Sequence, residues 1–420
     1  MKITNVQFSP GVSSFYFDDQ AAIKGGAGMD GFTYVGIATT PGFDNIRQSG
    51  EAISVLLQLE TGQWAEGDCA AVQYSGAGGR DPLFIADRYI AWMNSNLRPL
   101  LTGRDVSSFA ENARFIDLIT DNGRQIHTAI RYGLSQALLD ATAKATGRLK
   151  LEVICDEYRL PIVTSPLKLF GQSGDDRYNA VDKMIMKRVD ALPHGLINNV
   201  ATKLGENGGR LLEYVTWLTQ RIKKLRVDES YAPTIHIDVY GTVGLIFNND
   251  PSAIANYLNE LEKRAEKFPL YIEGPVDVGN KPGQIELLKA IKSRLSDIGS
   301  KVRIVADEWC NTHQDIIEFV DAKCCDMVQI KTPDLGSIHN TIEAVLYCHA
   351  HGVEAYLGGT CNETDVSARS CLHVAQATRP QRVLIKPGMG FDEGLTIVAN
   401  EMHRNQSILK AKYGEIGASQ

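Results

Sequence analysis

The chain has 420 residues and a formal net charge of −7, with 43 Lys and Arg against 50 Asp and Glu. This length exceeds one ordinary hydrophobic core and suggests a barrel of about 250 residues plus a second domain. The acidic balance, without any basic run, argues against nucleic-acid binding. No stretch approaches about 18 uncharged apolar residues, so no membrane span is expected.

The eight cysteines are scattered between Cys69 and Cys371, and none forms a CxxC pair. This spacing argues against a structural zinc site and against a disulfide framework. The first residues, MKITNVQFSPG, indicate a strand and a turn. They lack the apolar core of a signal peptide. We therefore expect a reducing, cytoplasmic location.

The first part of the chain mixes strand and helix patterns. Short strands are expected at residues 1–10, 32–39 and 53–62, followed by helical stretches from about Asp81. The segment 123–148 carries apolar residues at helical spacing. These patterns predict an α+β domain over residues 1–160, with a boundary near Pro161.

One glycine pattern in this domain needs separate treatment. Gly26, Gly28 and Gly31 satisfy GxGxxG, but a dinucleotide site requires a strand before the motif and a helix after it. Here a strand pattern, FTYVGIAT, follows instead. We interpret the segment as a flexible glycine loop and predict that it acts as a mobile lid.

After Pro161 the chain takes up a βα rhythm. Eight strands are expected at residues 166–172, 190–194, 234–240, 269–274, 302–307, 326–331, 354–358 and 382–386. Eight is the number that closes a parallel barrel. The sequence thus predicts an α/β protein in which the α+β domain precedes a (β/α)8 TIM-type barrel over residues 161–420.

Three acidic residues each end an apolar run: Asp238 in TIHIDVYG, Glu273 in PLYIEGPV and Asp307 in VRIVADEW. An isolated Asp at a strand end is usually a turn or cap residue, but these three recur at intervals of 35 and 34 residues. In a closed barrel the strand ends meet at one rim, so the carboxylates are expected to surround one point. Three hard oxygen ligands suit Mg²⁺.

The next strand, DMVQIKTP, carries Lys331 and, two residues earlier on the same face, Gln329. Burial and a nearby cation both disfavour the ammonium form, which predicts a lowered pKa and a useful base. Mg²⁺ could then hold a substrate carboxylate and stabilise the enolate formed on removal of the adjacent proton. A Schiff base is the alternative use of the lysine, but an iminium needs no metal as an electron sink.

Other strand ends supply further candidates. Gln172 follows PLKLFG, and His194 follows VDALP. Thr360 and Cys361 follow EAYLGG, a strand and a tight turn that would present backbone N–H and hydroxyl donors to an anion. We expect these side chains at the same barrel mouth.

Five segments carry a close resemblance to a known family: VADEWCNT, MVQIKTPDLG, IEGPVD, GGTCNETD and KPGMGFDEG. The chain resembles the methylaspartate ammonia-lyase family of the enolase superfamily over nearly its whole length. The resemblance implies an enolase-like fold, with a capping domain ahead of the barrel, and a carbon–nitrogen lyase that acts on a small amino acid.

The resemblance also implies the roles of individual residues. Asp238, Glu273 and Asp307 would bind Mg²⁺. Lys331 would remove the C3 proton of L-threo-3-methylaspartate and His194 would act on the other face, so that ammonia leaves C2 and mesaconate forms. The substrate would be held or bordered by Gln172, His194, Gln329, Thr360, Cys361, Gln73 and Leu384. Activation by K⁺, a homodimer and a role in glutamate fermentation are implied as well.

Three other readings of the residues stay open. A racemase or cycloisomerase of the same superfamily would use the same metal but would return a proton to carbon. A Schiff-base aldolase would form an adduct that borohydride traps. A barrel protein used only for binding would need none of the convergent polar side chains.

Overall fold

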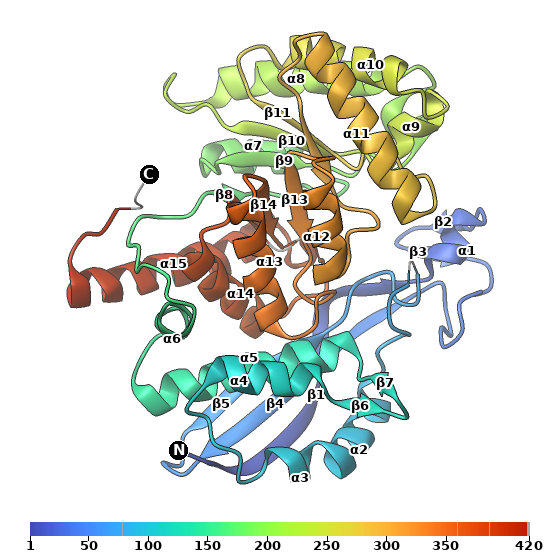
Figure 1. The fold of residues 1–420 in the computed structure, drawn as a ribbon. Helices are drawn as coiled ribbons and strands as arrows, with labels where there is room; N and C mark the ends of the chain where they lie inside the picture. The colour runs from blue at the N-terminus through green and yellow to red at the C-terminus, as the bar shows by residue number, and fades with distance from the viewer. Residues whose placement is uncertain (78, 359, 386, 418–420) are drawn as a thin grey trace.

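The computed structural model describes residues 1–77, 79–358, 360–385 and 387–417. Figure 1 shows two parts: an N-terminal domain in blue and cyan below, and a barrel from green to red above. The N-terminal domain is centred on a sheet with the strand order β1–β4–β5, formed by Ile3–Asp18, Arg47–Leu59 and Trp64–Ala70. It is antiparallel throughout.

The central helix of this domain is α5 (Thr128–Thr146), which lies across β5. The approach is closest where two glycines face each other: a Cβ on Gly67 would lie 2.4 Å from the backbone nitrogen of Ala137, and one on Gly133 would lie 2.4 Å from that of Cys69. Alternate residues of β4, such as Val55 and Leu57, are fully buried beneath the helix. The small residues therefore let the helix and the sheet share one core.

Shorter elements complete the α+β domain. The helices are α1 (Gln20–Lys24), α2 (Ala86–Asn96), α3 (Arg98–Leu101), α4 (Phe109–Asp117) and α6 (Lys150–Glu157). The short strands are β2 (Gly28–Asp30), β3 (Thr33–Val35), β6 (Thr120–Asp121) and β7 (Arg124–Gln125). The strands predicted at 1–10 and 53–62 belong to β1 and β4. The sequence missed β5, and the strand predicted at 32–39 shrinks to three residues of a hairpin.

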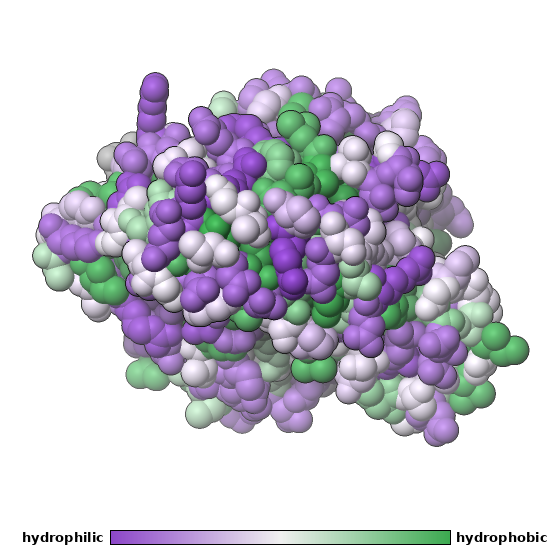
Figure 2. All heavy atoms as spheres, turned by 90° about the horizontal axis from the view of Figure 1, so that it is seen from below, coloured by the Kyte–Doolittle hydropathy of each residue, from purple (hydrophilic) through white to green (hydrophobic). Residues whose placement is uncertain are grey.

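The GxGxxG pattern falls in this β2–β3 hairpin, which projects from the body at the right of Figure 1. No strand–helix junction is formed there, so the context of a dinucleotide site is missing from this segment. The hairpin region exposes apolar side chains, and green atoms also gather at the right edge of Figure 2; Met29, Phe32, Val35 and Ile37 are 62, 56, 61 and 87 % exposed. Its role as a lid stays a prediction.

The barrel is closed by eight parallel strands, as predicted, and its strands follow one another in chain order. They are β8 (Leu169–Phe170), β9 (Ala191–His194), β10 (Thr234–Asp238), β11 (Leu270–Glu273), β12 (Arg303–Ala306), β13 (Met327–Ile330), β14 (Glu354–Leu357) and β15 (Arg382–Leu384). Each strand is shorter than the segment predicted for it. The predicted end of the last strand, Lys386, lies outside the described residues.

Helices surround the barrel (Figure 1). They are α7 (Asn179–Met186), α8 (Gly209–Leu225), α9 (Thr242–Ile246), α10 (Pro251–Ala265), α11 (Lys281–Asp297), α12 (His313–Asp321), α13 (Ile338–Ala350), α14 (Asp365–Thr378) and α15 (Phe391–Tyr413). Single turns of π-helix (Val200–Leu204) and 3₁₀-helix (Pro387–Met389) supplement them. Among the described residues, no helix is both long and apolar enough to cross a membrane.

The N-terminal domain covers the barrel at the carboxyl ends of the strands. Ser14 donates its backbone N–H to Glu363, in the loop after β14, and Arg80 binds Asp334, in the loop after β13. The strand ends on which the predicted site residues lie therefore face the covering domain. We call it the capping domain.

Candidate active site

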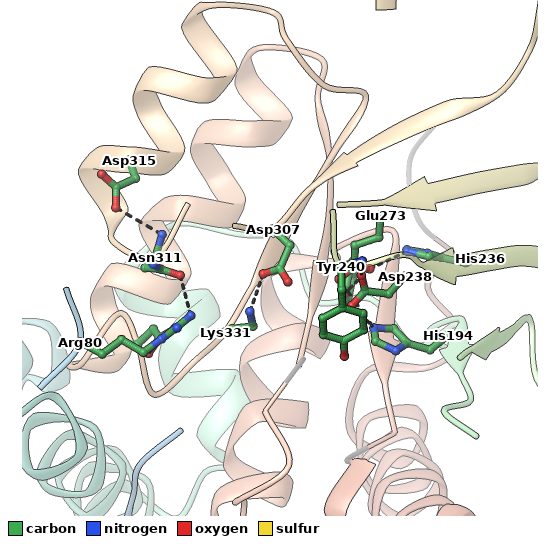
Figure 3. Close-up of polar contacts among 12 residues, drawn as sticks. Arg80, His194, His236, Asp238, Tyr240, Glu273, Asp307, Asn311, Asp315 and Lys331 are labelled. Atoms are coloured by element: carbon green, nitrogen blue, oxygen red, sulfur yellow. Dashed lines mark hydrogen bonds and ion pairs between the residues drawn. The ribbon is translucent and has the colours of Figure 1, made fainter. Parts of the chain in front are cut away.

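The predicted carboxylates meet at the covered mouth of the barrel (Figure 3). Asp238 ends β10 and Glu273 ends β11, and the two residues are direct partners in the strand register. His194 ends β9, and its Nε2 lies 3.6 Å from Oε1 of Glu273 and 3.8 Å from Oδ2 of Asp238. One ligand atom from each of the three lies within 4.8 Å of the others. All three side chains are buried.

Asp307, just after β12, and Lys331, just after β13, form an ion pair beside this group (Figure 3). The Lys331 ammonium contacts Oδ1 of Asp307 directly. The structure thus brings the base candidate and the third carboxylate to the same mouth. The carboxylate of Asp307 is engaged by the lysine, whereas His194 groups with Asp238 and Glu273.

The electrostatics of the mouth favour a bound cation. Burial raises the pKa of Asp238 well above its ordinary value, and the carboxylates of Glu273 and Asp307 raise it further. Burial likewise raises the pKa of Asp307, although Lys331 opposes the rise. Buried carboxylates that repel one another offer a hard, charged oxygen set, the donor chemistry that Mg²⁺ requires. The residues present therefore fit a divalent cation.

The predicted lowering of the Lys331 pKa is wrong for this arrangement. Burial does disfavour the ammonium form, but the adjoining carboxylate of Asp307 outweighs burial, and the pKa of Lys331 is raised instead. Glu308 and Asp334 act in the same direction as Asp307, and Arg80 acts against them. The lysine can serve as a base only after its ammonium group loses a proton, and the contact with the Asp307 carboxylate disfavours that loss.

Glu273 is held from inside the barrel by two residues that the sequence analysis missed. His236 Nε2 lies 2.7 Å from Oε2 of Glu273, and the Tyr356 hydroxyl lies 2.8 Å from both carboxylate oxygens. Burial would raise the pKa of Glu273, but the contacts with His194 and His236 outweigh it and lower that pKa. A signal was present: His236 precedes Asp238 by two residues, so both share one face of the strand.

Several predicted substrate contacts carry buried polar atoms that lack a hydrogen-bond partner. Among the described residues these include Nε2 of His194, Oε1 of Gln329 and Oγ1 of Thr360. Such atoms are costly unless a ligand or water completes them. Gln172 Nε2 lies 3.4 Å from Nδ1 of His194. Leu384, predicted to border the pocket, lies fully buried among the side chains that fill the barrel.

The capping domain contributes Gln73 to this mouth. The Cys361 thiol lies 3.1 Å from Oε1 of Gln73, and Nε2 of Gln73 donates to Asp18 at 2.6 Å. Arg47 in turn binds both oxygens of Asp18 at 2.7 Å. The sequence offered no signal for Asp18 and Arg47, because they lie far from the repeat that carries the strand ends.

A second link from the capping domain reaches the loops beside Lys331 and Asp307. Arg80 donates to Asp334 at 3.0 Å. It also donates to the side chain of Asn311 at 2.9 Å (Figure 3). A cavity of about 620 Å³ between the two domains has Arg80 and Asp334 in its wall. Arg80 was also missed by the sequence analysis.

Backbone conformation at the mouth is unusual as well. His194, Tyr240 and Trp309 have φ values of 60°, 49° and 67°, in the left-handed region that favours glycine. All three follow or end barrel strands around the carboxylates. Strained non-glycine residues cluster at functional sites, where the surrounding structure holds them in place.

The fold and the site define the class of protein: an enolase-type enzyme, with a capping domain over a barrel whose mouth carries acidic residues. The L-Ala-D/L-Glu epimerase from Bacillus subtilis shares this fold at a TM-score of 0.64 and 16% identity, over 94% of this chain and 91% of that one. Two family models, described as methylaspartate ammonia-lyase N-terminus and C-terminus, match residues 1–159 and 161–411. The chain belongs to the methylaspartate ammonia-lyase family of carbon–nitrogen lyases.

Individual relatives are similar over the full length. Methylaspartate ammonia-lyase from Citrobacter amalonaticus is 64% identical, over 98% of this chain and 100% of the relative. The crystal structure of that enzyme containing (2S,3S)-3-methylaspartic acid matches with a TM-score of 0.96, over 98% of this chain and 100% of that one. The Mg complex of β-methylaspartase from Clostridium tetanomorphum matches with a TM-score of 0.94 and 53% identity, over 98% of this chain and 100% of that one.

Proposed function

We propose that this chain removes ammonia from L-threo-3-methylaspartate to give mesaconate. The observation that carries the proposal is Lys331, whose side chain is only 16% exposed and faces acidic side chains at the ends of neighbouring barrel strands. The relative that contains (2S,3S)-3-methylaspartic acid supports the same substrate here. The reaction breaks the C3–H and C2–N bonds and forms the C2–C3 double bond.

Lys331 is proposed to accept the C3 proton on Nζ, after which ammonia leaves with the electron pair of the C2–N bond. The amine must be neutral for this, so Asp307 must give up its contact with the ammonium. His194 is proposed to act on the opposite face, where its unpartnered Nε2 can hold or move a proton. A base positioned against carbon in this way contributes about 10²–10⁴-fold in rate.

Asp238, Glu273 and Asp307 are proposed to hold Mg²⁺. The closeness of Asp238 to Glu273, the place of Asp307 at the same mouth and the Mg complex of the Clostridium relative support this assignment. When bound, the ion would supply positive charge against the charge that builds on the substrate carboxylate during proton removal. K⁺ is proposed as a second, activating cation.

Gln172, Gln329, Thr360 and Cys361 are proposed to bind the carboxylates and the amine. The oxygens of Gln329 and Thr360 that lack a partner support this role. The substrate ammonium could donate a hydrogen bond to Oε1 of Gln329, and a substrate carboxylate could accept one from the Thr360 hydroxyl. Gln73 and Leu384 are proposed to border the pocket. We further infer a division of the chain at Pro161, a homodimer, a cytoplasmic location and a role in glutamate fermentation.

The main alternative is another enolase-type reaction, such as that of a racemase or cycloisomerase. The test is to incubate the full chain with Mg²⁺ and L-threo-3-methylaspartate and to follow ammonia together with the ultraviolet absorbance of the conjugated product. Equal amounts of ammonia and mesaconate are expected. Proton exchange or racemisation without ammonia would favour the alternative.

A further inference from the structure

A line of polar side chains, buried except for the half-buried Glu354, runs through the barrel interior to Glu273. It begins with Glu354, the first residue of β14, which accepts a hydrogen bond from the Tyr271 hydroxyl at 2.9 Å. Arg382, the first residue of β15, lies over the Tyr271 ring at 4.3 Å and reaches Nδ1 of His236 at 3.4 Å. His236 then contacts Glu273. We call Glu354, Tyr271, Arg382 and His236 the polar column.

The polar column dictates which nitrogen of His236 carries the proton. A guanidinium can only donate hydrogen bonds, so Nδ1 of His236, which faces Arg382, must accept. Nε2 therefore carries the hydrogen and donates it to the carboxylate of Glu273 at 2.7 Å. The arrangement makes His236 a fixed donor toward Glu273.

The ring of His236 has little freedom to turn away. It stacks on Phe170 at 4.4 Å between centroids and lies 5.8 Å from the ring of Tyr271, and it is fully buried. The Tyr356 hydroxyl contacts Glu273 as a second donor. The carboxylate is thus restrained from within the barrel, while Oε1 also lies toward His194.

We propose that His236 is a positioning residue that fixes the Glu273 carboxylate for metal binding, with Arg382 setting its tautomer. Barrel interiors are ordinarily filled by branched apolar side chains, and burying an Arg and a His is costly by comparison. Partners that hold a metal ligand in place typically change metal affinity about 10–100-fold when they are removed. The inference rests on the proposed function only in taking Glu273 as a Mg²⁺ ligand.

The test compares two amide substitutions by calorimetric titration of the full chain with Mg²⁺. The amide nitrogen of His236→Gln can lie near the position of Nε2 and donate to Glu273, whereas that of His236→Asn lies near Nδ1 and falls short. His236→Asn is expected to raise the Mg²⁺ dissociation constant about 10–100-fold, and His236→Gln to restore much of the affinity. Titration with Mn²⁺ followed by EPR gives a second readout, in which His236→Asn should alter the spectrum of the bound ion.

Tyr271→Phe serves as the matched control. It removes the Tyr271 hydroxyl, which contacts Glu354 and does not reach Glu273. The Mg²⁺ affinity should therefore stay within about twofold of the wild-type value, even if the thermal midpoint falls. Equal Mg²⁺ affinities for His236→Asn, His236→Gln and wild type would overturn the inference. If either His236 variant fails to fold, Tyr356→Phe is the deciding variant. It keeps the ring, removes the second hydrogen-bond donor to Glu273 and should lower the Mg²⁺ affinity severalfold. An unchanged affinity would show that Glu273 is not restrained in this way.

Glu273→Gln separates this inference from the proposed function. If wild type binds no Mg²⁺, or Glu273→Gln binds it as tightly as wild type, the proposed metal role of Glu273 fails. If Glu273→Gln loses Mg²⁺ while both histidine variants keep it, the metal role stands and the positioning role of His236 fails.

Discussion

The two halves of the site are held from opposite sides. Asp238 and Glu273 form a barrel half, in which His236 and Tyr356 support Glu273 from the barrel interior. Asp307 and Lys331 form a cap half. The loops that follow them are bound by Arg80, which belongs to the capping domain.

This difference separates two tasks. The barrel half depends on strand register and on side chains inside the barrel. It should therefore form even if the capping domain shifts its position on the barrel. The cap half depends on a link between residues 254 positions apart in the sequence. Two of the three proposed Mg²⁺ ligands, Asp238 and Glu273, do not depend on this link. We therefore expect changes in the capping domain to affect proton transfer and substrate binding more than metal binding.

The largest effect is expected from Lys331→Ala. Loss of the amine should lower kcat for L-threo-3-methylaspartate about 10²–10⁴-fold and abolish exchange of the C3 proton in D₂O, followed by NMR. Mg²⁺ binding should persist, because all three proposed ligands remain and Asp307 loses a competing partner. As a matched variant, His194→Ala should impair the C3 epimer more than the threo substrate. Wild-type exchange of the threo proton in Lys331→Ala would show that another group is the base.

Arg80→Ala should give the next largest effect. It leaves Asp334 buried without its partner and frees the loops after Asp307 and Lys331, which should cost about 3–5 kcal/mol of stability. Both kcat and the thermal midpoint should fall. The Mg²⁺ dissociation constant, measured by calorimetry, should change much less than kcat, because Asp238 and Glu273 lie outside the link. A variant that binds Mg²⁺ far more weakly yet exchanges the C3 proton normally would reverse the assignment of the two halves.

The two halves also differ in how far the sequence could predict them. All eight barrel strands and the acidic residues at their ends follow from apolar runs at a regular spacing, because parallel strands must end at one rim. The pairing of Asp307 with Lys331 did not follow, and neither did the raised pKa of the lysine. Both depend on side-chain contacts between neighbouring strands that spacing does not determine.

The capping domain was the least predictable part. Asp18, Arg47 and Arg80 are charged residues in an irregular α+β sequence, and only the folded arrangement brings them beside the barrel. β5 was missed because its sequence, WAEGDCA, contains Gly67 and lacks a run of branched residues. That glycine is needed for the close approach of α5, which is a tertiary requirement rather than a local preference.

A smaller effect is expected from Asp18→Asn, which weakens the link between Arg47 and Gln73. The charged hydrogen bonds that orient Gln73 are lost, a change worth about 1.5–3 kcal/mol. Because Gln73 is proposed only to border the pocket, KM should rise about tenfold or more while kcat changes less. The control is Asp44→Asn, an exposed residue of the same domain. Unchanged KM in Asp18→Asn would show that the orientation of Gln73 does not matter.

The smallest effect is expected from Arg114→Ala. This variant tests whether the Arg80 ion pair stabilises the protein because it is buried, or only because it joins the two domains. Arg114 and Glu343 also join the capping domain to the barrel, at 2.8 Å, but their side chains are 53% and 33% exposed. The side chains of Arg80 and Asp334 are only 10% and 5% exposed. Water and salt screen the exposed pair, so Arg114→Ala should cost about 0.2–1 kcal/mol, and the loss should shrink further at high salt. Thermal unfolding of both variants at low and high ionic strength makes the comparison. Equal losses for Arg80→Ala and Arg114→Ala would mean that burial does not distinguish the two links, and the cap half would then owe its order to the interface as a whole.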